Sequence, residues 1–295
     1  IIAKYCLFIL LLRTKGIGLP EKITIVQVGG SVERALKGDY QIAVKAILTE
    51  SWQQTVKSRL SINLGLLFSL VLGMIVSFGA SSYLGGIENV LADPQAGMLL
   101  NIVVTVAIWP FMAGVEMMGV QHAVGMNTQP KMIFSFLNRA SWVVLCTLLT
   151  SVLISFGFQL FVVPGVFLAV TLSLTVPLVI EKKMTPMKAI VLSIKALRFK
   201  FFPLLTLYSL LLSLLIVLLL PFLLLLESSI APLGIIIFLV GISFLAPLFY
   251  NVKGVVYREV FGISIAASDD TNIDHHSGDS TSKDINSGSN DTFSA

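Results

Sequence analysis

Glu116 is the residue whose type and position most suggest chemistry, because it is the only acidic residue inside a long apolar stretch. A carboxylate in a membrane interior is costly, so it indicates a proton or cation site by default. The position of Glu116 along its predicted helix offers a simpler interpretation of this residue. Counted from Met98 at 1.5 Å per residue, Glu116 lies about 27 Å along a helix, close to the inner interface. There it would snorkel or pair with Lys131 or Arg139, and we favour this interpretation.

The three histidines give no clear site. His122 is a candidate proton partner for Glu116, but its position predicts a solvated loop residue. His275 and His276 lie in a polar tail, whereas a stable metal site needs three or four ligands in fixed geometry. Gly-rich phosphate loops, nucleophile elbows and paired active-site carboxylates are absent from the sequence. We therefore expect no catalytic residues, no cofactor and no metal.

Two rows of small polar residues recur at four-residue spacing within apolar stretches. The rows are Thr147, Ser151, Ser155 and Gln159, followed by Thr171 and Thr175. One interpretation is a polar path through a helix bundle. The other is hydrogen bonding between the two helices of a hairpin, worth about 0.6 kcal/mol per bond in membranes, and we favour it.

The composition is typical of a membrane protein. Of the 295 residues, 56% are hydrophobic and 12% are charged, whereas a soluble domain is about one quarter charged. A bilayer crossing takes about 20 apolar residues. Six apolar stretches meet this description, at residues 62–83, 98–118, 142–163, 165–180, 204–226 and 233–252. We expect an all-α fold with a six-span membrane domain over residues 62–262.

The positive charges predict the orientation of these spans. The connections at residues 84–97, 163–165 and 227–231 contain no Lys or Arg, and the chain's 20 basic residues lie in the other connections or at the termini. Loops that carry Lys and Arg remain in the cytoplasm. The sequence therefore predicts a multi-pass protein of the bacterial inner membrane with both termini in the cytoplasm.

Three basic segments, one before each membrane hairpin, are predicted to be amphipathic helices. They cover residues 40–60, 131–138 and 185–202. In the third, Met187, Ile190, Val191, Ile194 and Leu197 mark an apolar face. Lys188, Lys195 and Arg198 point elsewhere, and Pro203 is expected to end the helix. We expect these helices to lie on the inner leaflet, where anionic lipids attract Lys and Arg.

The two ends of the chain differ from the membrane domain. Residues 1–61 form a cytoplasmic segment, within which the apolar run Tyr5–Leu12 is too short to span a bilayer. Residues 263–295 are predicted to be a disordered, acidic cytoplasmic tail, because a segment rich in Ser, Asp and Asn cannot bury enough apolar surface to fold. Two cysteines, Cys6 and Cys146, do not make a disulfide framework.

The segment from Val162 to Leu197, followed by RFKFF, resembles a bacterial membrane-domain superfamily. This superfamily includes YciC-type inner-membrane proteins and the membrane domain attached to some glycerophosphoryl diester phosphodiesterases. The elements that carry the resemblance are Pro164-Gly165, Pro177–Ile180, Glu181 and Pro186–Phe199. They cover about forty residues and imply the six-span membrane fold. Only about forty residues follow the last span, so the resemblance implies no phosphodiesterase activity.

These observations lead to an expected function. We expect a non-enzymatic integral membrane protein that acts in envelope or lipid homeostasis and whose partners are the anionic lipids of the inner leaflet. The alternative is a small-molecule or lipid transporter or exporter that uses a polar path near Glu116. A membrane-bound enzyme is less favoured, because it would need clustered His, Asp or Glu. Nothing indicates nucleic-acid binding, and homo-oligomers or membrane-protein partners remain open.

Overall fold

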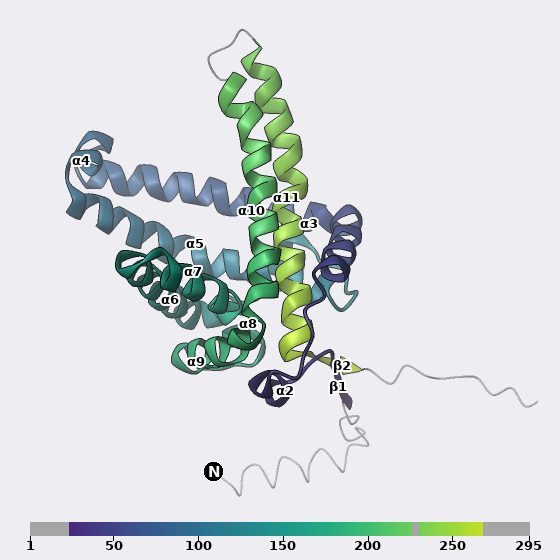
Figure 1. Cartoon of the computed structure of the whole chain (residues 1–295). Helices are drawn as coiled ribbons and strands as arrows, with labels where there is room; N and C mark the ends of the chain where they lie inside the picture. Colours follow the sequence, from purple (N-terminus) through teal and green to yellow (C-terminus); the bar gives the residue numbers. More distant parts are fainter. Residues whose placement is uncertain (1–23, 226–229, 268–295) are drawn as a thin grey trace, which may run out of the picture. The chain divides into compact units, whose positions relative to one another are not determined.

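The computed structural model of this chain describes residues 24–225 and 230–267. By contacts the chain divides into two units, one formed by residues 1–26 and 266–295 and the other by Gln27–Ile265. All helices of the described residues belong to the second unit, and the fold is nearly all-α, as predicted (Figure 1). The expectations for residues 1–20 and for the tail from Ser268 onward lie outside the described residues.

Six helical segments of the described chain are long and apolar enough to cross a membrane, which confirms the predicted number. They are Val44–Tyr83, Pro94–His122, Pro130–Leu160, Val162–Glu181, Pro186–Leu225 and Ala231–Phe261. Most extend past the predicted apolar stretch at one end or both. The apolar pattern marks the part of a helix that suits lipid, whereas the helix itself continues into its polar flanks.

Helix α3 (Val44–Tyr83) joins the first predicted surface helix and the first span into one helix with a kink at Ser58. A row of small residues at multiples of four positions along the span is buried, namely Gly65, Ser69, Gly73 and Ser81. This row lets α3 approach α5 (Pro94–His122) closely. A Cβ atom at Gly65 would lie 3.0 Å from Val115 Cγ2 of α5. The short helix α4 (Ile87–Ala92) joins the two.

The predicted surface helix at residues 131–138 is wrong. The structure has two 3-10 segments there, η1 (Pro130–Phe134) and η2 (Leu137–Arg139). The cause is Ile133, which is buried between α3 and α5. Its backbone lies so close to Gly114 that a Cβ atom there would be 2.6 Å from Ile133 Cα. Ile133 therefore anchors the segment between the two helices, whereas most of its other residues remain exposed.

The second hairpin turns earlier than the sequence predicts. Helix α6 (Ala140–Leu160) is followed by one extended residue, Phe161, and α7 begins at once (Val162–Thr171). Pro164 and Gly165 lie in the first turn of α7, where proline is tolerated. The fourth span is also broken, because a turn at residues 172–174 separates α7 from α8 (Thr175–Glu181).

The last hairpin follows the amphipathic segment. Helix α9 (Pro186–Leu197) is followed by η3 (Arg198–Lys200), and α10 (Phe201–Leu225) begins immediately. Pro203 therefore lies in the first turn of α10 and does not end the preceding helix, contrary to the prediction. Helix α11 (Ala231–Phe261) runs past the predicted end of the sixth span at residue 252.

Three short elements complete the described chain. Helix α2 (Val32–Lys37) is capped by Ser31, whose side chain accepts a hydrogen bond from the Arg34 backbone amide. Strand β1 (Thr24–Val28) pairs with strand β2 (Ile263–Ala267) in a two-stranded sheet. The beginning of the predicted disordered tail is thus a strand. Its sequence, ISIAA, alternates only weakly, and pairing with a distant segment cannot be read from it.

The buried side chains gather at one end of the helices, in a region that we call the base core. It consists of the start of α3, the end of α5, the start of α6, the end of α11, α8, α9 and the first turns of α10. Beyond it, large apolar side chains on α3, α10 and α11 are exposed, such as Phe78, Leu224 and Ile236. Water would penalise such faces, whereas in lipid apolar side chains need no protein partner.

Candidate functional site

Glu116 on α5 is buried in the base core and forms an ion pair with Lys253 on α11. The favoured interpretation of Glu116 as a paired residue agrees with this, but the partner is Lys253 and not Lys131 or Arg139. Both residues lie about 33 Å from the start of their helices, at Pro94 and Ala231, counting 1.5 Å per residue. That distance slightly exceeds the hydrocarbon thickness of about 30 Å, so each helix is long enough to hold its residue at one edge of a bilayer.

A chain of hydrogen-bonded side chains lies beside this ion pair. His122 Nδ1 is 2.8 Å from Asn251 Oδ1, and His122 Nε2 is 2.7 Å from Thr128 Oγ1. Thr128 Oγ1 is in turn 2.6 Å from Ser61 Oγ. At the other end, the Asn251 amide donates to Thr55 Oγ1 over 2.9 Å. His122 is buried, so the prediction of a solvated loop histidine is wrong.

From Thr128 to Thr55, the donors in this chain run in one direction. Thr55 donates to the Ser51 carbonyl oxygen and therefore accepts from the Asn251 amide. Asn251 Oδ1 must then accept from His122 Nδ1, which leaves Nε2 to accept from Thr128. Ser61 and Thr55 lie on opposite sides of the kink at Ser58, so the chain joins both arms of α3 to α5 and α11.

Arg258 is the centre of a second polar cluster, on the last turns of α11. Its guanidinium binds both carboxylate oxygens of Glu50, at 2.5 and 2.9 Å, and also the Ala123 carbonyl oxygen and Glu259. A polar cavity of about 340 Å³ adjoins it. Because the donors of Arg258 face two carboxylates and a carbonyl, this cavity has little capacity for an anion.

The two polar rows do not form a path. Ser151, Ser155 and Gln159 are exposed on α6, and only Thr147 is buried. The hydroxyls of the second row donate to preceding backbone carbonyls, although Thr175 also has a side-chain hydrogen bond with Cys146 of α6. Thr171 Oγ1 donates to the Phe167 carbonyl oxygen within its own helix over 2.7 Å, and Thr175 likewise turns back to Leu172 over 2.8 Å.

The favoured interpretation of these rows as hydrogen bonds across the hairpin is therefore wrong for Thr171, whereas Thr175 also has a side-chain hydrogen bond with Cys146 across the hairpin. A helical hydroxyl can satisfy itself on a preceding carbonyl, which four-residue spacing cannot reveal.

Helix α9 places its three basic residues at the surface, as predicted, but its apolar face is rotated. Lys188, Lys195 and Arg198 are exposed. The face that packs on the base core consists mainly of Ala189, Ile190, Leu192, Ser193, Ala196 and Leu197. Met187 and Val191, which were assigned to the apolar face, are exposed beside the lysines, and a shallow apolar hollow lies between them and Leu36 of α2.

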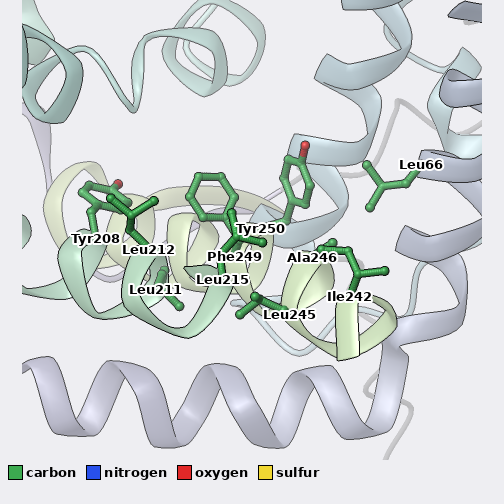
Figure 2. A pocket seen from close by; sticks show the side chains of 10 residues that line it. All are labelled: Leu66, Tyr208, Leu211, Leu212, Leu215, Ile242, Leu245, Ala246, Phe249 and Tyr250. Carbon is green, nitrogen blue, oxygen red and sulfur yellow. The ribbon is translucent and has the colours of Figure 1, made fainter. Parts of the chain in front are cut away.

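An apolar pocket of about 300 Å³ lies between α3, α10 and α11. Figure 2 shows the rings of Tyr208, Phe249 and Tyr250 standing in a row along it. A second apolar hollow of about 380 Å³ adjoins it and shares Tyr208, Leu212 and Phe249 as a common wall. The Tyr208 hydroxyl is satisfied, because it donates to Ser173 Oγ over 2.9 Å.

Several functional residues were missed at the sequence level, and most of them lie on the last three turns of α11. Asn251, Lys253, Tyr257 and Arg258 each bind a side chain of another element. The sequence did show a group of polar residues at the end of an apolar stretch. Such residues are usually interpreted as the polar end of a membrane span and not as a site.

The described residues contain no cluster of three or more His, Cys, Asp or Glu that could hold a metal ion. Comparison with protein-family models, curated proteins and solved structures finds no match to this chain.

Proposed function

We propose that this integral membrane protein resides in the bacterial inner membrane and acts without enzymatic activity in envelope or lipid homeostasis, by engaging anionic lipid at the cytoplasmic surface. The resemblance to the YciC-type superfamily belongs to this proposal. The observation that carries it is the exposed side of α9 and η3. There Lys188, Lys195 and Arg198 lie beside the exposed apolar residues Met187 and Val191.

This combination suits a membrane surface. Lys and Arg near an anionic leaflet contribute about 1 kcal/mol each, and apolar side chains on the same side enter the headgroup boundary. The opposite side of α9 is buried in the base core, so the surface is held in place by packing and needs no folding on contact. A soluble partner would leave Met187, which is 61% exposed, without an apolar environment.

Labelling of Val191 in membranes of different charge tests the proposal. A Val191→Cys variant, with Cys6 and Cys146 replaced by Ser and Ala, is placed in lipid nanodiscs and treated with a water-soluble maleimide. We expect slower labelling in phosphatidylglycerol than in phosphatidylcholine. Changing Lys188, Lys195 and Arg198 to Glu should abolish the difference, whereas changing Lys45, Lys57 and Lys131 to Glu should preserve it. Equal labelling in both lipids would contradict the proposal.

Transport is less well supported by the described residues. Glu116 is neutralised by Lys253, and the row Ser151, Ser155 and Gln159 faces outward and away from any shared interior. A substrate path would need these groups around one polar cavity. The polar cavity near Glu50 and Arg258 contains none of the residues of either row.

A further inference from the structure

We propose that the pocket between α3, α10 and α11 is a binding site for one glycerolipid of the cytoplasmic leaflet, with an acyl chain in the pocket and its ester carbonyl on the Tyr250 hydroxyl. The site deepens the proposed function, because it names a lipid class, but it uses different residues from the basic surface of α9.

The depth of the pocket supports a lipid occupant. Helices α10 and α11 lie side by side, and counted at 1.5 Å per residue from its far end, Tyr208 of α10 lies about 26 Å in. Tyr250 of α11 lies about 28 Å from Ala231. In an upright α10–α11 hairpin both tyrosines come near the edge of a hydrocarbon layer about 30 Å thick, on the side of the base core. The pocket therefore opens where acyl chains begin, at the level preferred by membrane tyrosines.

The lining selects an apolar occupant. The pocket wall is almost entirely carbon, and Leu212 and Phe249 at its rim are 57% and 39% exposed. About 300 Å³ corresponds to roughly ten water-sized groups, but water in this lining would find almost no polar partner. In Figure 2 the three aromatic rings stand in a row along one side of the pocket, where a flexible chain can lie against them.

Tyr250 supplies the polar end of the site. Its ring contacts Phe249 edge-on at 5.6 Å, but its hydroxyl has no hydrogen bond to another described residue. A largely buried tyrosine hydroxyl normally finds a partner. Tyr208, on the same wall, is already bonded to Ser173. Lipid chains and leucine are equally apolar, so burial alone cannot hold a chain in place. The free hydroxyl gives the site its preference for an ester.

Photo-crosslinking tests the site directly. The full-length protein in nanodiscs is loaded with phosphatidylglycerol that carries a diazirine in one acyl chain, and crosslinked peptides are identified by mass spectrometry. We expect crosslinks at residues 208–215 and 242–250. Ala246→Trp, which fills the pocket, should abolish them. Leu239→Trp, on the exposed face of the same helix, should leave them unchanged and controls for the added ring.

Tyr250→Phe separates the hydroxyl from the packing and guards against misfolding of the tryptophan variant. We expect about a fivefold loss of crosslinking, the effect of one ordinary hydrogen bond, while Tyr83→Phe at an exposed position has no effect. Crosslinks spread evenly over α10 and insensitive to Ala246→Trp would show ordinary bilayer contact and overturn the proposal. Crosslinks to a second copy of the chain, or a co-purified molecule without an ester, would also overturn it.

One variant tests the two proposals separately. The variant with Lys188, Lys195 and Arg198 changed to Glu should keep the crosslinks in the pocket while losing its response to anionic lipid at Val191. If both signals disappear together in that variant, the pocket is not an independent site, and the proposal of a lipid held by Tyr250 is wrong.

Discussion

Asn251 illustrates how one amide can hold several elements together. It accepts from His122 and donates to Thr55, and it is fully buried. Asn251→Ala leaves a histidine donor without its acceptor inside the base core. We expect the free energy of unfolding to fall by about 1–3 kcal/mol, the cost of unsatisfied buried polar groups.

Unfolding by SDS in mixed micelles measures this loss. Ser213→Ala is the matched control, because the Ser213 hydroxyl is exposed and binds only the Ser209 carbonyl oxygen of its own helix. Its change should stay within about 0.5 kcal/mol. Equal effects of the two substitutions would show that the hydrogen-bond chain contributes nothing to stability.

Because of Tyr40, the free energy of unfolding depends on pH in the alkaline range. Its buried hydroxyl donates to the Ala196 carbonyl oxygen over 2.8 Å, and burial raises the pKa of Tyr40 from 10.0 to about 12. The unfolded chain therefore releases this proton first. The contribution of Tyr40 is complete below pH 10 and is lost as pH rises towards 12.

Tyr40→Phe removes this titration. Between pH 10 and pH 12 we expect the free energy of unfolding to fall less steeply in the variant than in the wild type. The difference between the two curves is the measured quantity, because other tyrosines contribute to both. Parallel curves would show that Tyr40 titrates alike in the folded and unfolded chain.

At the scale of elements, the crossing of α5 and α11 depends on two glycines. A Cβ atom at Gly254 would collide with the Gly119 carbonyl oxygen, and one at Gly119 would collide with the Tyr250 carbonyl oxygen. The helix backbones thus touch directly beside the Glu116–Lys253 pair. Gly254→Ala should cost about 1–3 kcal/mol by forcing the helices apart.

Gly79 provides the control for that substitution. It lies within α3, and a Cβ atom there would meet nothing within 4 Å. Gly79→Ala should be neutral or stabilise the protein by up to about 1 kcal/mol, because alanine favours the helix. Thermal unfolding in detergent compares the two variants, and a tolerated Gly254→Ala would disprove the close crossing.

The sequence predicts single elements of this protein better than their contacts. Each span is recognisable from its hydropathy alone, so all six were predicted. The turn at residues 172–174 was missed, because VTLSLTV is apolar on both sides of the break and contains neither Gly nor Pro. Partners were missed for another reason. His122 and Asn251 lie 129 positions apart, and no local pattern connects an imidazole with an amide across that distance.

For the surface of α9, the prediction from the sequence was partly correct. Its lysines were assigned correctly to the exposed side, because charged groups rarely enter a core. Its apolar residues were divided wrongly between the buried and the exposed face, because nearly every uncharged residue in the segment is apolar or small. The face of Ala189 and Ala196 was chosen by fit against the base core, where bulkier Met187 has no room.

For the whole molecule, the orientation in the membrane is the prediction with the widest reach. Reporter fusions after Asn89 and Ser229 should report the periplasm, and fusions after Gln129 and Ser268 the cytoplasm. The reason is that the connections near the first pair contain no Lys or Arg. A phosphatase that is active only outside and a fluorescent protein that is active only inside provide complementary readouts, and one exchanged result would invalidate the six-span topology.

The polar residues at the end of α11 have a consequence for biosynthesis. Glu50, Glu116, His122 and Glu181 are all made and inserted long before residues 251–258, which supply their partners. Until α11 arrives, Glu50 and Glu116 lack the basic partners that Arg258 and Lys253 supply. Arrival of the last helix is thus the step that completes assembly. A chain truncated before Asn251 retains all five earlier apolar segments, yet it should present those charges to membrane proteases and be degraded.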